Sequence, residues 1–326
     1  LQGEIAEAAA SVVGVGEHYL APNAENQITV PVANTGMEAI SSIGYKATVG
    51  SAEHEKEITL AKPIYAIYGW EEQLAFTLPA TSEPGDATTT IEITKVNGKQ
   101  CGSSASSTCR VLSFVPKKLA LMEEYTGCWC GWCPRGFVAM EKMSKLNPDF
   151  VGIAYHDCDP MEMSGGYPQM PLGFPVAFLN RVFSCDPFHA ADKSSAFTMP
   201  KVYAQYCAGL TPAEIAVEAS IDGQGIVKAT ATCRWAAMPF TRNYKIEYAL
   251  LADDLHSESD EWNQTNYYSG KDPQENPGME EFCEADHYVS DLHYNDVAIM
   301  TSGLSGVEGS VAEISTEQHT VHTFTF

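Results

Sequence analysis

The chain lacks long apolar runs and is poor in basic residues. No hydrophobic run approaches the roughly 20 residues that a membrane-spanning helix requires. Only 19 lysines and arginines stand against 42 aspartates and glutamates, which gives a formal net charge of −23. Because proteins bind nucleic acid mainly by neutralising phosphates, this charge argues against a nucleic-acid partner. It also disfavours adsorption to anionic lipid, so we expect a solvated acidic surface and no transmembrane span.

Three common sequence signals are also missing. The chain opens with Leu1-Gln-Gly-Glu and shows no charged segment followed by an apolar one, so a removed leader or a lipid anchor upstream of Leu1 stays open. Gly303-Leu-Ser-Gly-Val lacks the final glycine of a nucleophile elbow, which leaves a serine hydrolase unsupported. No second CxxC pair and no HxxxH pair accompanies the single CxxC. We therefore expect no bound metal and no cofactor.

Cysteine, by contrast, is abundant. Ten cysteines are many for a cytosolic protein of this size, and together with the few lysines they favour an oxidising compartment. Cys101 and Cys109 flank a Gly/Ser stretch between two expected strands, so we expect a disulfide that closes a loop there. Cys233, in an expected strand, could pair with Cys283.

The hydrophobic patterns divide the chain into three expected domains. Residues 1–116 show short alternating runs separated by turn signals, which are typical of an immunoglobulin-like β-sandwich. Residues 117–209 alternate strands and helices, and residues 210–326 return to a strand pattern. The expected fold class is therefore α+β multidomain, with a central α/β domain flanked by two β-rich domains. The successive strands expected in the last domain are 213–221, 226–234 and 244–251, with 319–326 as the final strand.

The most informative stretch is Cys130-Gly-Trp-Cys133, followed at once by Pro134-Arg-Gly136. The run 118–127 upstream is typical of a buried strand, and apolar residues recur at helical spacing from Phe137 to Leu146. A strand, a CxxC pair and an amphipathic helix together favour redox chemistry over a permanent disulfide or half of a zinc site. Unpaired N–H groups at the start of such a helix stabilise a thiolate.

Two motifs resemble the thioredoxin superfamily. Residues 124–133 are similar to that family's active-site segment, in which an acid and a tryptophan precede the CxxC pair. Residues 174–180 are similar to its cis-proline strand, and Pro175 follows Cys133 by 42 residues, about the spacing of a minimal thioredoxin fold. The resemblance covers roughly residues 117–209 and implies that the central α/β domain is thioredoxin-like.

The wider arrangement resembles the Omp28-related cell-envelope proteins of Bacteroidetes. The likeness is carried by residues 123–127, 133–135, 262–268 and 293–297. It implies a periplasmic or outer-membrane-associated location and does not define a substrate.

The resemblance to thioredoxins implies a catalytic role for three residues. Cys130 would be the attacking thiolate, and Cys133 would be the buried cysteine that resolves the mixed disulfide. Glu124 stands at the position of the family's buried acid and could relay a proton to or from Cys133. Alternatively, Glu124 is an exposed carboxylate at the end of the strand, because the neighbouring Glu123 indicates that this end tolerates water.

Trp129, Trp132, Phe174 and Pro175 would form the substrate-binding surface. Pro175, if cis, would bring the backbone of Phe174 beside the sulfurs, where it could pair with an extended substrate. The alternative is a trans proline at the first residue of a strand. Trp132 departs from the proline that is common between thioredoxin cysteines, so the direction of electron flow stays open.

Two further residues could modulate the site. Arg135 either favours the thiolate electrostatically or is a solvated residue of the first helical turn. Cys128 could pair with Cys158, act as a third thiol or be a free surface cysteine.

These observations predict thiol–disulfide exchange on protein substrates in the cell envelope, with a redox partner that resets the pair. The competing interpretation is a surface binding protein, in which the CxxC is a permanent staple and the flanking β domains bind polypeptide or glycan. Trp262, Tyr267 and Tyr268 are either a recognition patch or packing at a domain seam, and packing is favoured.

Overall fold

The computed structural model describes residues 6–190 and 196–326, and it is rich in β-structure distributed over several sheets. Two sheets pack against each other in the N-terminal part, with strand orders β1-β3-β6 and β2-β8-β7-β4-β5. Their inward-facing side chains form one apolar core, which explains the alternating sequence pattern and fits an immunoglobulin-like arrangement. The strands are β1 (Ala10–Val12), β2 (His18–Leu20), β3 (Asn26–Asn34), β4 (Ile40–Val49), β5 (Ala52–Ile64), β6 (Glu72–Leu78), β7 (Gly85–Val96) and β8 (Lys99–Val111).

The Gly/Ser stretch expected to be a loop is the middle of β8. Cys101 and Cys109 therefore lie eight residues apart in one extended strand, a span of about 26 Å at about 3.3 Å per residue. Both cysteines are free. The expected disulfide between them is wrong, because the stretch is an extended strand that pairs with β7 from Ser103 to Cys109, with one irregularity at Cys101 and Gly102.

A six-stranded mixed sheet with the order β12-β11-β9-β10-β18-β15 holds the CxxC segment. β9 and β10 are parallel and are connected through helix α1, whereas β11 runs antiparallel to β9 and β12 antiparallel to β11. Helices α1 and α2 pack on one face of this sheet through a shared apolar cluster. The elements are β9 (Leu121–Thr126), α1 (Pro134–Leu146), β10 (Val151–His156), β11 (Val176–Leu179), β12 (Phe183–Cys185) and α2 (Met199–Cys207).

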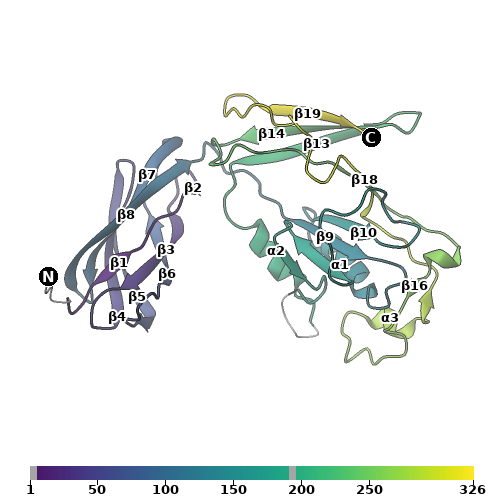
Figure 1. Ribbon diagram of the computed structural model, residues 1–326, viewed down its shortest axis with the longest axis horizontal. Coiled ribbons are helices and arrows are strands. Elements are labelled where there is room, and N and C mark those ends of the chain that lie inside the picture. The colour runs from purple at the N-terminus through teal and green to yellow at the C-terminus, as the bar shows by residue number, and fades with distance from the viewer. Residues whose placement is uncertain (1–5, 191–195) are drawn as a thin grey trace.

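The segment after residue 209 contributes strands to three sheets, of which the smallest has only two short strands. β15 (Ala249–Ala252) and β18 (Val297–Thr301) extend the central sheet beyond β10. The expected strand 244–251 is thus not a neighbour of 226–234, because its last residues pair with β18 instead. β13 (Ala213–Ile221), β14 (Val227–Trp235) and β19 (Thr320–Thr325) form a separate three-stranded sheet, green to yellow in Figure 1. The domain boundaries at residues 116 and 209 stay a prediction.

Between β15 and β18 the chain makes an excursion over the start of α1. It contains the 3₁₀-helix η1 (Asp260–Trp262), the two-residue strands β16 (Gln264–Thr265) and β17 (Tyr288–Val289), and helix α3 (Glu280–Glu284). Figure 1 shows this excursion on the side of the central sheet away from the N-terminal sandwich. Within the described ranges, no helix is long and apolar enough to cross a membrane.

Candidate functional site

Cys130 and Cys133 are joined by a disulfide, with their Cα atoms 5.3 Å apart. Cys133 is the N-cap of α1, and Pro134 occupies the first helical position, where a missing N–H does not weaken the helix. The Cys130 carbonyl accepts a hydrogen bond from the Cys133 N–H at 3.0 Å, which closes the loop. Cys133 is fully buried, whereas Cys130 is 6% exposed. Cys130 is therefore the cysteine of the pair that solvent reaches.

Glu124 is buried on the α1 side of β9, so the alternative of an exposed strand-end carboxylate is wrong. Among the described residues its Oε1 has no hydrogen-bond partner. A Cβ built on Gly136 would lie 1.7 Å from this oxygen and 3.4 Å from the Cβ of Pro175. Gly136 thus admits the carboxyl between the first turn of α1 and Pro175. Burial is the main cause that raises the pKa of Glu124 to about 8, and the charges of Asp186 and Asp296 add to it.

The neighbouring Glu123 is also buried, contrary to the expectation that this strand end tolerates water. Its side chain points to the opposite face of β9, where Arg181 donates to both carboxylate oxygens, from Nη2 to Oε1 at 2.7 Å and from Nε to Oε2 at 2.9 Å. Arg181 also binds Glu247, from Nη1 to Oε2 at 2.7 Å. Both oxygens of the Glu123 carboxylate are therefore bound by Arg181.

A cavity of about 400 Å³ lies between α1, the sheet and the excursion. Glu124 lines it together with three further carboxylates, those of Glu141, Asp253 and Asp296. Burial, followed by the charge of Asp253, raises the pKa of Asp296 to about 6. The cavity therefore gives Glu124 polar surroundings in which other proton-binding groups are present. Its remaining polar lining residues are Thr126, Ser144, Lys145, His156, Gln264, Tyr294 and Asn295.

The Phe174–Pro175 peptide bond is cis, as expected. Trp129 packs edge-on against Phe174 with ring centroids 5.4 Å apart, and its Nε1 donates to the Asp157 carbonyl at 2.6 Å. The indole remains 48% exposed. Phe174 and Pro175 also line an open, mainly apolar hollow of about 760 Å³ with the exposed Leu172. Trp129, Phe174 and Pro175 therefore form one wall beside the disulfide.

Trp132 contributes to a second wall. Its ring is 38% exposed and stands edge-on to Tyr267 and Tyr268, with centroids 5.7 and 5.3 Å away. The Lys271 Nζ lies 4.6 Å from the centre of the indole. Tyr268 is buried, so the packing alternative is confirmed for that residue, whereas Tyr267 is half exposed.

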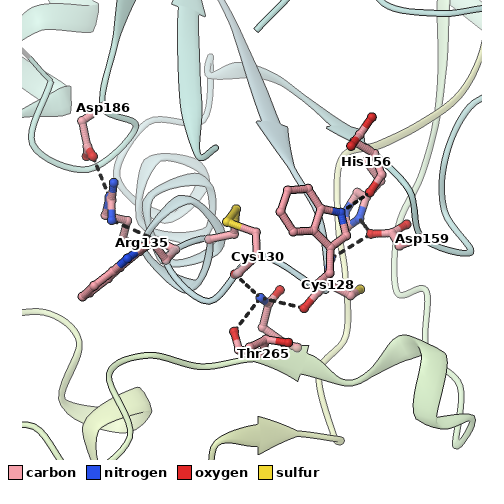
Figure 2. The surroundings of a disulfide bond; sticks show 12 residues. Cys128, Cys130, Arg135, His156, Asp159, Asp186 and Thr265 are labelled. Carbon is pink, nitrogen blue, oxygen red and sulfur yellow. Dashed lines mark hydrogen bonds and ion pairs between the residues drawn. A yellow bond between two sulfur atoms is a disulfide. The ribbon is translucent and has the colours of Figure 1, made fainter. Parts of the chain in front are cut away.

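Arg135 is held by an ion pair on the same side as Trp132. Its Nε donates to Asp186 Oδ2 at 2.6 Å, and the guanidinium lies 6.0 Å from the centre of the Trp132 ring. Figure 2 shows this pair on one side of the disulfide and Cys128, His156 and Asp159 on the other. Because both partners of the ion pair are largely buried, Arg135 is not a solvated first-turn residue.

Residues 264–268, which we term the strap, run along the CxxC loop. The Thr265 N–H donates to the Cys128 carbonyl at 2.7 Å, and the Gln264 Nε2 donates to the Cys130 carbonyl at 2.9 Å. The Tyr267 N–H donates to the Gly131 carbonyl at 2.9 Å. Sequence reasoning missed these contacts, and Gly131 is the one local signal for them. A Cβ there would lie 2.4 Å from the Tyr267 ring.

The other cysteines are free. Cys128 is buried, with its Sγ donating to the Tyr294 hydroxyl at 3.4 Å, whereas Cys158 is exposed. The alternatives of a Cys128–Cys158 disulfide and of a surface Cys128 are therefore wrong. Cys233 and Cys283 belong to different apolar clusters, so their expected pairing is wrong as well. Eight of the ten cysteines are thus free.

Comparisons with known proteins leave the family open. No family model matches the chain, and no curated protein is similar to it. Among solved structures, HBP35 of Porphyromonas gingivalis is 16% identical with a TM-score of 0.36, over 65% of this chain and 64% of that chain. The match thus spans less than two thirds of HBP35. The CARDB domain of the PF1109 protein from Pyrococcus furiosus is 15% identical with a TM-score of 0.23, over 34% of this chain and 93% of that chain. TM-scores this low carry no argument about function.

Proposed function

We propose that this protein is a thiol–disulfide oxidoreductase whose central domain is thioredoxin-like. The observation that carries the proposal is the Cys130–Cys133 disulfide at the start of α1, together with the buried Glu124 carboxyl against the first turn of that helix, whose Oε1 has no hydrogen-bond partner among the described residues. The strand order β12-β11-β9-β10, with α1 between the two parallel strands, supports the thioredoxin-like assignment.

The proposed reaction begins from the reduced pair. The Cys130 thiolate attacks a substrate disulfide, so a Cys130–substrate bond forms and one substrate sulfur leaves as a thiolate. The Cys133 thiolate then attacks the Cys130 sulfur, which releases the second substrate thiolate and closes the Cys130–Cys133 bond. Two electrons pass to the substrate, and a dithiol redox partner returns them by the same steps in reverse.

Two features of the site suit these steps. The N–H groups at the start of the 13-residue helix α1 stabilise negative charge on the adjacent sulfur. Glu124, with a pKa near 8, would take the proton of the Cys133 thiol and return it near neutral pH. Arg135 and Cys128 would modulate the couple from its two sides, and the reaction needs no cofactor.

The two walls indicate how a substrate would bind. Trp129, Phe174 and Pro175 flank Cys130 on one side, and Trp132 flanks it on the other. The strap already occupies the carbonyls of the CxxC loop, so an extended polypeptide would bind along the Phe174 side. The proposed location, periplasmic or outer-membrane-associated, rests on the resemblance to cell-envelope proteins.

A thiol-exchange assay tests this function. Wild-type protein should reshuffle a scrambled disulfide substrate in glutathione buffer, and Cys130→Ser should reduce the rate to that of glutathione alone. Cys133→Ser should accumulate a mixed disulfide on Cys130, detectable by mass spectrometry. Cys158→Ser, which removes an exposed free thiol, is the matched control and should leave the rate unchanged. A Cys130→Ser variant with wild-type rate would contradict the proposal.

The second candidate function is a binding protein with a structural disulfide. The hydrogen bonds of the strap to the CxxC loop favour it, because they hold that loop in one conformation. Peptide or glycan capture that is insensitive to reduction, together with an inactive wild-type protein in the exchange assay, would support this alternative.

A further inference from the structure

A compact cluster of three metal-ligating side chains lies beside the CxxC loop but does not belong to it. Cys128 follows β9, His156 is the last residue of β10, and Asp159 lies in the turn after it. One ligand atom from each residue lies within 4.8 Å of the other two. All three side chains are almost fully buried. Figure 2 shows the cluster converging on the side of the loop opposite Arg135.

We propose that Cys128, His156 and Asp159 bind a divalent cation of the Zn²⁺ class. A thiolate, an imidazole and a carboxylate are the three ligand types that Zn²⁺ uses in proteins. The sulfur ligand disfavours Mg²⁺ and Ca²⁺, which prefer oxygen. Three protein ligands leave a fourth tetrahedral position for a solvent molecule.

Neighbouring groups hold the ligands in place. Asp159 accepts hydrogen bonds from two backbone N–H groups, that of Cys128 on Oδ2 at 2.9 Å and that of Met161 on Oδ1 at 2.8 Å. Tyr294 contacts the Cys128 sulfur through its hydroxyl and stands edge-on to the His156 ring, with centroids 5.4 Å apart. Such outer contacts orient ligands and lower the cost of organising a metal site.

Binding would exchange a proton for the ion. A hydrogen bond joins His156 Nδ1 to Asp159 Oδ2 at 2.7 Å, and the Cys128 thiol carries a proton that it donates to Tyr294. On binding, the thiol proton leaves to solvent and the imidazole proton moves from Nδ1 to Nε2, so the 2+ charge is balanced by one thiolate and one carboxylate. With metal–ligand bonds of about 2.0–2.1 Å, the nitrogen and oxygen must separate to about 3.3 Å, a shift of roughly half an ångström.

The cavity under α1 lies next to the cluster, although Cys128 and Asp159 do not line it. His156 and Tyr294 line this cavity of about 400 Å³, together with the carboxylates of Glu141, Asp253 and Asp296. A concave surface with this excess of negative charge concentrates cations. Cys128 follows β9 and His156 ends the neighbouring strand β10, so these ligands are far apart in the chain and form no short ligand motif.

A Co²⁺ titration of the oxidised protein tests the proposal. The intact Cys130–Cys133 disulfide removes those two sulfurs as ligands, so a thiolate-to-Co²⁺ charge-transfer band must come from another cysteine. We expect this band at one equivalent, its displacement by Zn²⁺, and tighter binding at higher pH because a proton is released. If the wild-type protein shows no such band, the proposal is overturned, and no variant is needed for that conclusion.

Two ligand variants and two control variants assign the ligands. Cys128→Ser and His156→Gln should each abolish the band and weaken Zn²⁺ binding at least about tenfold, with folding checked by circular dichroism. Cys158→Ser should keep the band. His293→Ala should keep it as well, because His256, Asp291 and His293 form an exposed cluster without a thiol. A band that survives Cys128→Ser, or disappears in Cys158→Ser, overturns the assignment.

Discussion

The two faces of strand β9 carry neighbouring buried glutamates with opposite surroundings. On one face, Glu123 is bound through both oxygens by Arg181, which Glu247 also binds. On the other face, Glu124 Oε1 has no partner among the described residues and abuts the Cα of Gly136. Burial by itself therefore does not mark a functional acid. A buried carboxyl whose two oxygens are both held in an ion pair is structural, whereas one that keeps an oxygen without a partner near a reactive pair can exchange protons.

The largest loss of stability should follow from removal of the ion pair between Glu123 and Arg181. Glu123→Ala removes the buried one of the two carboxylates that bind Arg181. It should lower the free energy of unfolding by about 3 kcal/mol. This is the low end of the usual range, because Arg181 is partly exposed and keeps Glu247. Urea denaturation measures the loss. An unfolding free energy equal to that of the wild type would mean that the pair is not structural.

The titration of Glu124, on the other face of β9, should make the free energy of unfolding depend on pH. Below about 4.5 the Glu124 carboxyl is protonated in both folded and unfolded chains, and between 4.5 and about 8 only the unfolded chain releases its proton. The free energy of unfolding should therefore fall with rising pH across this window, by an amount on the order of a few kcal/mol, and level off above it.

Glu124→Gln cannot ionise, so its unfolding free energy should lack this fall and should exceed that of the wild type at pH 8. Denaturation curves at several pH values provide the measurement. Parallel pH profiles for the two proteins would show that Glu124 is not the titrating group. In the exchange assay the same variant should resolve mixed disulfides more slowly, because the proton acceptor for Cys133 is gone.

Gly136 offers a test of the packing that keeps Glu124 in its place. Gly136→Ala should destabilise the protein by about 1–3 kcal/mol, because the added Cβ collides with the Glu124 carboxyl. In a Glu124→Ala background the same change should cost little, since the colliding atoms are absent. The double-mutant cycle measures this coupling, and additive effects would contradict the contact.

The smallest effect concerns the ion pair next to the disulfide. Asp186→Asn weakens the bond to Arg135 and should cost about 1 kcal/mol or less, because both partners retain some solvent. The Asp186 charge also raises the pKa of Glu124. Its removal should therefore move the pH-dependent fall in stability to lower pH, and an unchanged midpoint would rule out this coupling.

Local sequence signals predicted much of the fold. Alternating residues gave most strands of the N-terminal sandwich, and Pro134 with the following apolar spacing gave helix α1. They failed where the outcome depends on distant pairing. β18 joins β10 from about 140 residues away, and no local pattern encodes that choice. The Ser-rich middle of β8 resembles a loop in composition, yet β7 pairs with it throughout.

The site was predictable to a similar degree. The CxxC pair forms a disulfide, the Phe174–Pro175 bond is cis, and Glu124 is buried as one alternative required. The partner of Glu123 could not be predicted, because Arg181 comes from a turn after β11 and carries no motif. The strap and the environment of Cys128 depend on an excursion between β15 and β18, whose position follows only from the folded sheet.

The central claim is that Cys130 and Cys133 form an exchanging couple and not a permanent staple. Its most direct test is the reduction potential of that pair, obtained by trapping thiols in defined dithiol and glutathione buffers and counting them by mass spectrometry. The account predicts a value between about −120 and −270 mV, the range of thiol–disulfide oxidoreductases. A value below about −300 mV, typical of structural disulfides, would contradict it.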